Sequence, residues 1–172
     1  MKKLVIVGAL ILWSCSSQLR VYSDFDKDVS LKQYHTYSWA ANADIEKRNN
    51  PLYYNELNDK RIKAAVDEQL CKKNFNQVSE NSDAIIHYHL VIDNKTSFIQ
   101  EPYGIYGPYW MRGGNVIQYT EGTLIIDIMD AENKSLIWRG WAVSVVDDSG
   151  QMQPQVLSKA IEKIFEKYPG TN

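Results

Sequence analysis

The chain has 172 residues, enough for one domain with a sizeable hydrophobic core. Its 19 basic and 21 acidic side chains give a net charge of −2 and form no basic cluster, which argues against nucleic-acid binding and against electrostatic docking on anionic lipid. The sequence also lacks the serine-hydrolase elbow, the phosphate loop, the dinucleotide-binding glycines and the zinc-ligand spacing of cysteines and histidines. We therefore expect no catalytic residue and no cofactor.

The first fifteen residues, MKKLVIVGALILWSC, have the layout of a secretory signal. Lys2 and Lys3 form a basic start, an apolar run follows from Leu4 to Trp13, and the small Ser14 precedes Cys15. The apolar run is about half of the roughly 20 residues that a spanning helix needs. The ending LWSC is similar to a bacterial lipobox, although its tryptophan is bulky for that motif. We expect residues 1–14 to be a signal peptide and Cys15 to be lipidated; an ordinary cleaved signal and an uncleaved anchor are the alternatives.

Removal of the signal peptide changes the charge and leaves a short tether. Without Lys2 and Lys3 the mature chain has 17 basic and 21 acidic side chains, a net charge of −4. Acyl chains must then provide the membrane attachment, at about 0.8 kcal/mol per buried methylene. Residues 15–20 are expected to form the lipidated N-terminus and short linker, and residues 21–170 a single domain close to the bilayer. Cys71 is then a lone thiol, expected half-buried in a helix.

The first half of the domain predicts two strands and a helix. LRVYSDFD and YHTYSWA are rich in β-branched and aromatic residues, and the polar stretch 41–50 before Pro51 predicts a loop. NELNDKRIKAAVDEQLCKKN carries Ile62, Val66 and Leu70 at helical spacing. Asn74 suits the left-handed position that follows a helix.

The second half predicts three strands and a helix. SDAIIHYHLVIDNKTSFI predicts one strand, and VIQYTEGTLIIDIMDAENKSLIWRGWAVSVV predicts two that turn at DAENKS. QPQVLSKAIEKIFEKYPG predicts a helix that begins at Pro154 and stops at Pro169. The order ββαβββα predicts an α+β fold, a two-layer, mostly antiparallel sheet of about five strands with two helices on one face.

The stretches VYSDFD…LKQYHTYSWA, SDAIIHYHL, GTLIIDIMDAENKSLIWRGWA and AIEKIFEKYP together resemble the bacterial lipoprotein family called domain of unknown function 4136. The resemblance covers nearly the whole mature chain and implies an anchored α+β domain. It carries over no activity and no catalytic residue. Lipoprotein resemblance also favours the periplasmic side of the outer membrane, because Ser16 is not the aspartate associated with inner-membrane retention and SSQLR lacks an acidic export signal.

His87 and His89 are the best candidates for metal ligands. Positions i and i+2 of a strand point the same way, so both imidazoles could reach one ion. Asp127 could supply a third ligand from the neighbouring strand, since it lies on the face away from the core. The simpler interpretation is two half-exposed histidines on a polar sheet face. Arg139 is expected to pair with Asp127 across adjacent strands, and Asp130 is expected to be a turn residue.

The same sheet face is unusually apolar for the solvent side of a two-layer domain. Trp138 points the other way and is expected in the core under the helices. An apolar face left exposed would mark an interaction site, and it is the main sequence argument for a protein partner. The apolar residues expected on this face are Ile85, Val91, Ile125, Ile137, Trp141 and Val143.

The loop QEPYGIYGPYWMRGGN is expected to be a hairpin tip. If each element crosses the domain once and reverses, the tip lies at the membrane-near end, although the long connection at 41–50 could invert this parity. Tyr and Trp are favoured at a lipid interface. A flexible tip, partner contact and lipid contact all remain open for its aromatic residues, Tyr103, Tyr106, Tyr109 and Trp110.

Together these features predict a non-enzymatic outer-membrane lipoprotein that faces the periplasm and binds or supports another envelope component. A ligand- or metal-binding module that uses the His-x-His face is the alternative. A hydrolase is the least favoured class, because no residue can be assigned to its chemistry.

Overall fold

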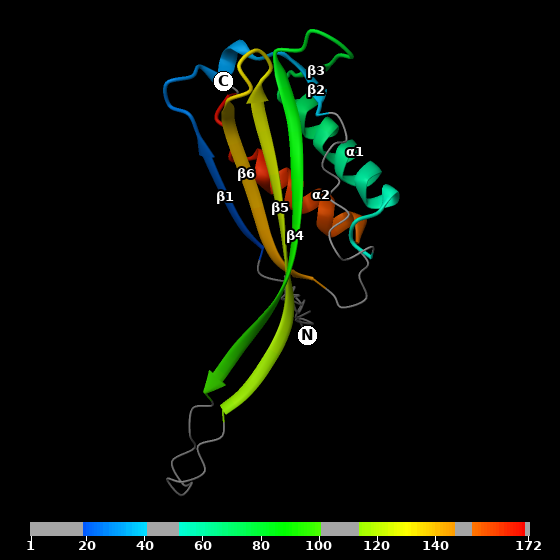
Figure 1. Ribbon diagram of the computed structural model, residues 1–172, viewed down its shortest axis with the longest axis vertical. Helices are drawn as coiled ribbons and strands as arrows, with labels where there is room; N and C mark the ends of the chain where they lie inside the picture. The colour runs from blue at the N-terminus through cyan, green and yellow to red at the C-terminus, as the bar shows by residue number, and fades with distance from the viewer. Residues whose placement is uncertain (1–18, 41–51, 101–113, 147–152, 171–172) are drawn as a thin grey trace, which may run out of the picture.

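The computed structural model of the protein describes residues 19–40, 52–100, 114–146 and 153–170. Six strands form one sheet in the order β1-β6-β5-β4-β2-β3, and both helices lie on one face of it (Figure 1). The predicted α+β fold is therefore confirmed. The elements are β1 (Arg20–Phe25), a 3-10 turn η1 (Leu31–Gln33), β2 (Thr36–Trp39), α1 (Glu56–Lys72), β3 (Asn76–Gln77), β4 (Ala84–Gln100), β5 (Gly114–Asp130), β6 (Leu136–Val146) and α2 (Pro154–Phe165).

The sheet is mixed and has six strands, where a mostly antiparallel sheet of about five was predicted. The pairs β1–β6, β6–β5 and β5–β4 are antiparallel, but β2 runs parallel to both β3 and β4. The helix α1 lies in the connection from β2 to β4, and a helical crossover of this kind joins parallel strands. The additional strand β3 has two residues, too few to produce a period in the sequence.

Both helices begin and end for local reasons. The side chain of Asn55 accepts a hydrogen bond from the backbone N–H three residues later and caps α1. Asn74 follows α1 with a φ of 63°, the predicted left-handed conformation. Pro154 opens α2 as predicted, but the α-helix ends at Phe165 rather than near Pro169, because the chain continues in tighter three-residue turns.

The core lies between the sheet and the helices. The indole ring of Trp138 is fully buried, as predicted, and its centroid lies 5.5 Å from that of Phe165 and 5.4 Å from that of Tyr168. The largest fully buried side chains are Trp138, Phe165, Ile62, Leu70, Ile86, Ile126, Ile128, Ile137, Ile161, Ile164 and Val66. They come from both helices and from the strands beneath them, so one core holds the two layers together.

Two predicted side-chain positions are wrong. Ile137 was expected on the solvent face, but it is fully buried. The pairing of β5 with β6 shifts between Ile128 and Met129, opposite Trp138 and Leu136, so Ile137 occupies a bulge that breaks the alternation of strand faces. Cys71 was expected to be half-buried, but it is an exposed free thiol on α1.

Strands β4 and β5 form a hairpin much longer than the rest of the sheet. They pair from Ala84–Asp130 to Gln100–Gly114, whereas β6 ends at Val146, opposite Thr120. The pairs beyond that point project from the body as a two-stranded ribbon (Figure 1). Residues 101–113, which include Tyr103, Tyr106, Tyr109 and Trp110, lie outside the described residues.

The projecting ribbon and the start of β1 lie at the same end of the domain. Arg20, the first residue of β1, is opposite Val143, which pairs with Thr123. The ribbon therefore continues from that row beyond the end of the sheet at which β1 begins. The predicted position of the aromatic tip near the membrane concerns residues outside the described ones. Cys15 lies outside the described residues. No helix in the described segments has the length and apolar character to cross a membrane.

Candidate functional site

The sheet face opposite the helices carries a row of charged residues across four strands. The strand register places Asp24, Arg139, Asp127 and His87 side by side on β1, β6, β5 and β4. Strand alternation makes all four point away from the core. We call this surface the open face; its residues are Tyr22, Asp24, His87, His89, Val91, Ile125, Asp127, Arg139, Trp141 and Val143.

Asp127 and Arg139 form the pair that the sequence predicted. The guanidinium Nε and Nη2 donate to the two carboxylate oxygens, each at 2.6 Å. The Asp127 side chain is 5% exposed, whereas that of Arg139 is 42% exposed. The hydrogen bonds that Arg139 donates to the Asp127 carboxylate raise the pKa of the guanidinium above its usual value. The buried carboxylate is therefore neutralised by a two-pronged partner that reaches it from the solvent side.

The structure brings together the three predicted metal ligands. Nδ1 of His87 and Nε2 of His89 are 2.9 Å apart, and Nε2 of His89 lies 3.5 Å from Oδ2 of Asp127. One ligand atom from each of the three residues lies within 4.8 Å of the others. Two strands position them, because His87 and His89 share a face of β4 and His87 is directly opposite Asp127 on β5.

Two opposing effects decide what this cluster can bind. Zinc bonds of about 2.0–2.1 Å at a tetrahedral angle place two ligand atoms about 3.3 Å apart, so the histidine nitrogens would need to separate by only a few tenths of an ångström. However, Arg139 already donates to both oxygens of Asp127. Its positive charge would oppose a divalent ion by an amount on the order of several kcal/mol at about 4 Å. The geometry suits a metal; the electrostatics favour a structural ion pair.

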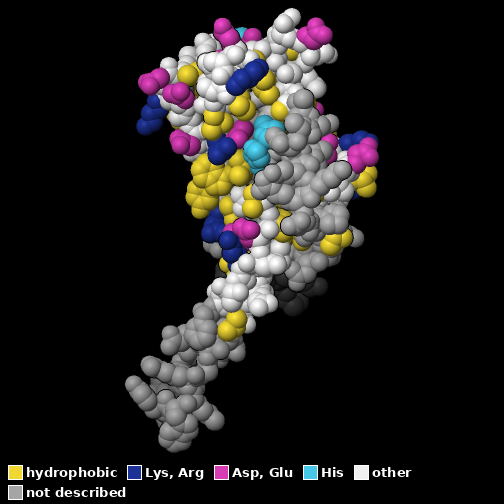
Figure 2. Space-filling view, viewed as in Figure 1, with side chains coloured by type: hydrophobic (Ala, Val, Ile, Leu, Met, Phe, Trp, Pro, Cys, Tyr) yellow, Lys and Arg dark blue, Asp and Glu magenta, His cyan; other side chains and the backbone are white. Residues whose placement is uncertain are grey.

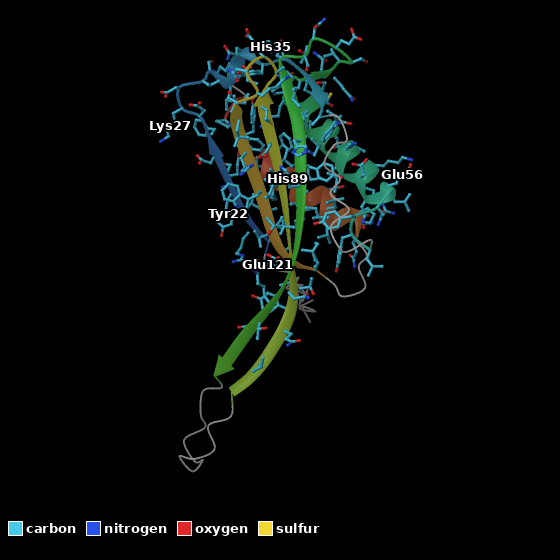
Figure 3. All side chains as sticks on the ribbon, viewed as in Figure 1. Tyr22, Lys27, His35, Glu56, His89 and Glu121 are labelled. Carbon is cyan, nitrogen blue, oxygen red and sulfur yellow. The ribbon has the colours of Figure 1, made fainter. Side chains whose placement is uncertain are left out.

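An apolar row lies beside the charged one. The rings of Tyr22 and Trp141 stack with centroids 5.4 Å apart and planes inclined by 23°. Ile125 follows Trp141 across the sheet, and His89 follows Ile125. Hydrophobic side chains gather next to the histidines on this face (Figure 2), with Tyr22 on β1 and His89 on β4 (Figure 3). No helix of the described segments covers them.

Ion pairing and turn contacts frame the open face at its two ends. At the end near the ribbon, Arg20 on β1 and Glu121 on β5 form a salt bridge of 2.6 Å. At the other end Asp130 accepts the backbone N–H groups of the turn and the hydroxyl of Tyr34 at 2.7 Å. Asp130 is therefore the predicted turn residue. The hydrogen bond from the backbone N–H of Asn133 makes the largest contribution to lowering the pKa of the Asp130 carboxyl, and the Tyr34 hydroxyl makes the second.

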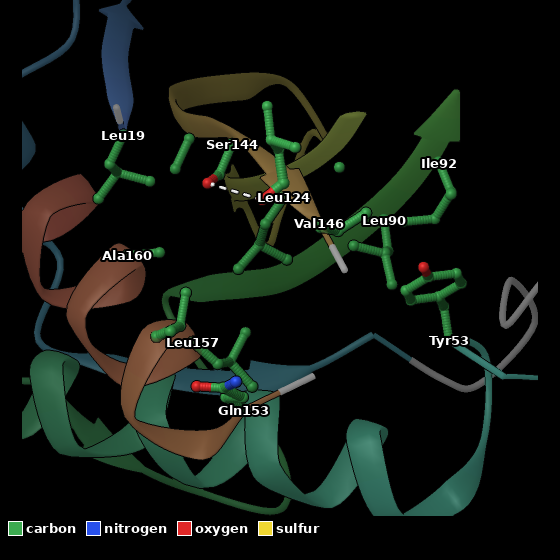
Figure 4. Close-up of a pocket in the computed structure, with 14 residues that line it drawn as sticks. Leu19, Tyr53, Leu90, Ile92, Leu124, Ser144, Val146, Gln153, Leu157 and Ala160 are labelled. Carbon is green, nitrogen blue, oxygen red and sulfur yellow. Dashed lines mark hydrogen bonds between the residues drawn. The ribbon is translucent and has the colours of Figure 1, made fainter. Parts of the chain in front are cut away.

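A cavity on the helix side of the sheet was not predicted. It has a volume of about 310 Å³ and lies between the middle of β4 and β5, the end of β6 and the start of α2 (Figure 4). Its wall is mostly apolar, with Leu90, Leu124 and Leu157 among the lining residues. Ala142 and Ala160 face it from β6 and α2, and small residues on facing elements are the signal that could have indicated this space.

Comparisons with known proteins agree with the fold. A PDZ domain protein from Parabacteroides distasonis ATCC 8503 is 12% identical with a TM-score of 0.56, over 91% of this chain. The match spans only 38% of that protein. A DUF4136 family protein from Bacteroides thetaiotaomicron VPI-5482 is 16% identical with a TM-score of 0.53, over 91% of this chain and 99% of that one. At these identities the likeness concerns the fold alone.

A search of curated proteins finds no significant match. The model of one protein family, described as domain of unknown function (DUF4136), matches residues 21–170. This range includes both helices and every described strand, apart from Arg20, the first residue of β1. The chain therefore belongs to the DUF4136 family.

Proposed function

We propose that this protein is a non-enzymatic lipoprotein of the outer membrane that faces the periplasm and binds another envelope protein through its open face. The signal layout of residues 1–15 supports the anchor, because a basic start, an apolar run and a lipobox-like ending occur in order. The short linker holds the domain near the bilayer. Binding rather than catalysis is favoured because Asp127 and Arg139 of the open face are already paired with each other.

The observation that carries the proposal is the composition of the open face. Tyr22 and Val91 are exposed, and Ile125, Trp141 and Val143 are partly exposed. An apolar patch rimmed by polar side chains is typical of a protein interaction site. Tyrosine, tryptophan and arginine are also the residues that most often dominate binding energy at interfaces. The Asp127–Arg139 pair would fix the orientation of a partner.

Site-specific photo-crosslinking in intact cells tests this proposal. A photo-reactive amino acid replaces Val143 on the open face in one variant and Leu57 in a matched control. Leu57 is 64% exposed on α1, away from the open face. We expect a discrete crosslinked product from position 143 only, reduced by the additional change Trp141→Ser. Identical products from both positions, or none from 143, would contradict the proposal.

A second candidate function, divalent metal binding, is favoured by one observation, the convergence of His87, His89 and Asp127. Calorimetric titration with Zn²⁺ tests this candidate by comparing the wild type with the His89→Ala variant, both purified without an affinity tag. If Asp127 is a ligand, Arg139→Leu should bind more tightly than the wild type, because the competing guanidinium is gone. No heat of binding in the wild type and in Arg139→Leu would remove this candidate.

A further inference from the structure

We propose that the projecting part of the β4–β5 hairpin lies against the lipid bilayer at the level of the headgroups. This segment, called the arm here, consists of Lys95–Gln100 and Gly114–Tyr119, which pair with each other beyond the end of β6. The inference rests on the proposed lipid anchor and specifies what the domain does next to the membrane.

The arm is longer than the tether that joins Cys15 to the domain. From Val91, which is in register with Arg20 through β5 and β6, the strand continues for nine residues to Gln100. At about 3.3 Å per residue, this distance is about 30 Å. The five steps from Cys15 to Arg20 extend at most about 18 Å. The arm projects past the end of the domain at which β1 begins, so a bilayer within that reach of Arg20 meets the arm unless the domain lies on its side.

The arm has few charged residues and exposes aliphatic side chains. Of the twelve residues of the arm only Lys95, at its base, is charged, in a chain with 23% charged residues. Val116 is 60% exposed and Ile117 is 45% exposed, and adjacent strand positions point to opposite faces. Both faces of the ribbon therefore present an aliphatic side chain to the surroundings. A two-stranded ribbon alone is marginally stable in water, so an apolar support is expected.

The unpaired edges of the arm limit how deeply it can enter the bilayer. Each outer edge of the ribbon has backbone N–H and C=O groups without a strand partner among the described residues. Such edges are not tolerated in the hydrocarbon core, where no water can satisfy them. The headgroup region, about 5–8 Å thick on each side, offers both water and apolar contact. Because the mature chain is acidic, the contact should depend little on anionic lipid.

Depth-dependent fluorescence quenching tests the arm directly. The full lipidated chain carries Cys71→Ser and one new cysteine for a fluorescent label, Ile117→Cys on the arm or Glu132→Cys as the control. Glu132 lies in the turn between β5 and β6, at the opposite end of the sheet. Both proteins are reconstituted in vesicles of phosphatidylethanolamine and phosphatidylglycerol that contain a quencher at the headgroup or at the bilayer centre.

We expect the headgroup quencher to act severalfold more strongly on position 117 than on position 132, and the central quencher to act weakly on both. If the protein floats with the vesicles but position 117 is not quenched, the arm proposal is overturned and the anchor stands. If position 117 is shielded from the lipid-borne quenchers and shows energy transfer between labelled copies, the arm binds a second copy of the chain. That result also overturns the proposal. If the protein does not float, the anchor itself fails, and the inference fails with it.

Discussion

Replacement of Arg139 by leucine should destabilise the domain, because it removes the partner of a buried carboxylate. Asp127 is 5% exposed and both of its oxygens accept hydrogen bonds from Arg139 at 2.6 Å. Loss of one member of a fully buried pair costs about 3–5 kcal/mol, whereas exposed pairs contribute about 0–1 kcal/mol. Because the Arg139 side chain is 42% exposed, we expect an intermediate loss of about 2–3 kcal/mol, discounted for screening by water.

Urea and thermal unfolding, followed by tryptophan fluorescence and circular dichroism, measure this loss. For a domain of this size the change corresponds to a decrease in melting temperature of roughly 4–12 °C. The double variant Asp127→Val/Arg139→Leu removes both charges and places a β-branched residue in the strand, so most of the stability should return. A single variant within about 0.5 kcal/mol of the wild type, or a double variant no better than the single, would refute this reasoning.

Three further predictions concern the core, the pH dependence and a helix cap. In Gly140→Ala the added Cβ would lie 2.4 Å from Cη2 of Trp138, so unfolding should show a loss of about 2–3 kcal/mol from overpacking; an unchanged midpoint contradicts it. The backbone N–H of His35, followed by the Thr36 side chain, lowers the pKa of Asp83. The resulting stability is present above the unfolded pKa of about 3.9 and is lost as pH falls through the folded pKa of Asp83. The free energy of unfolding should therefore decrease less steeply with falling pH in Asp83→Asn than in the wild type. Parallel pH dependences of the two proteins refute this. Asn55→Ala should cost about 1 kcal/mol and fray the start of α1 in hydrogen exchange, whereas unchanged protection there argues against the cap.

The parts of the fold that could be predicted from the sequence depend on local periodicity. Strand alternation placed Asp127 opposite Arg139 and Trp138 in the core, and both are confirmed. Helical spacing and end residues located α1 and the start of α2. The same logic brought His87, His89 and Asp127 together, which the structure also shows. Whether that cluster binds a metal depends on Arg139, whose competition only the three-dimensional geometry reveals.

The parts that could not be predicted depend on contacts between distant segments. The bulge at Ile137 has no glycine or other local signal, and it reverses the face of one residue. The parallel pairing of β2 follows from where α1 packs, not from the residues of β2. The cavity beside Leu124 lies where small residues of β6 and α2 face each other across the two layers, a contact that neither segment indicates by itself. The projection of the arm depends on β6 ending before its neighbours do.

The intact mass of the protein extracted from cell membranes tests the central claim, lipid anchoring at Cys15, most directly. We expect a chain that begins at Cys15 and carries added acyl mass, and a Cys15→Ala variant that loses this mass and appears in the soluble fraction. An unmodified N-terminus, or a mature chain that retains residues 1–14, would show that the protein is not anchored through Cys15.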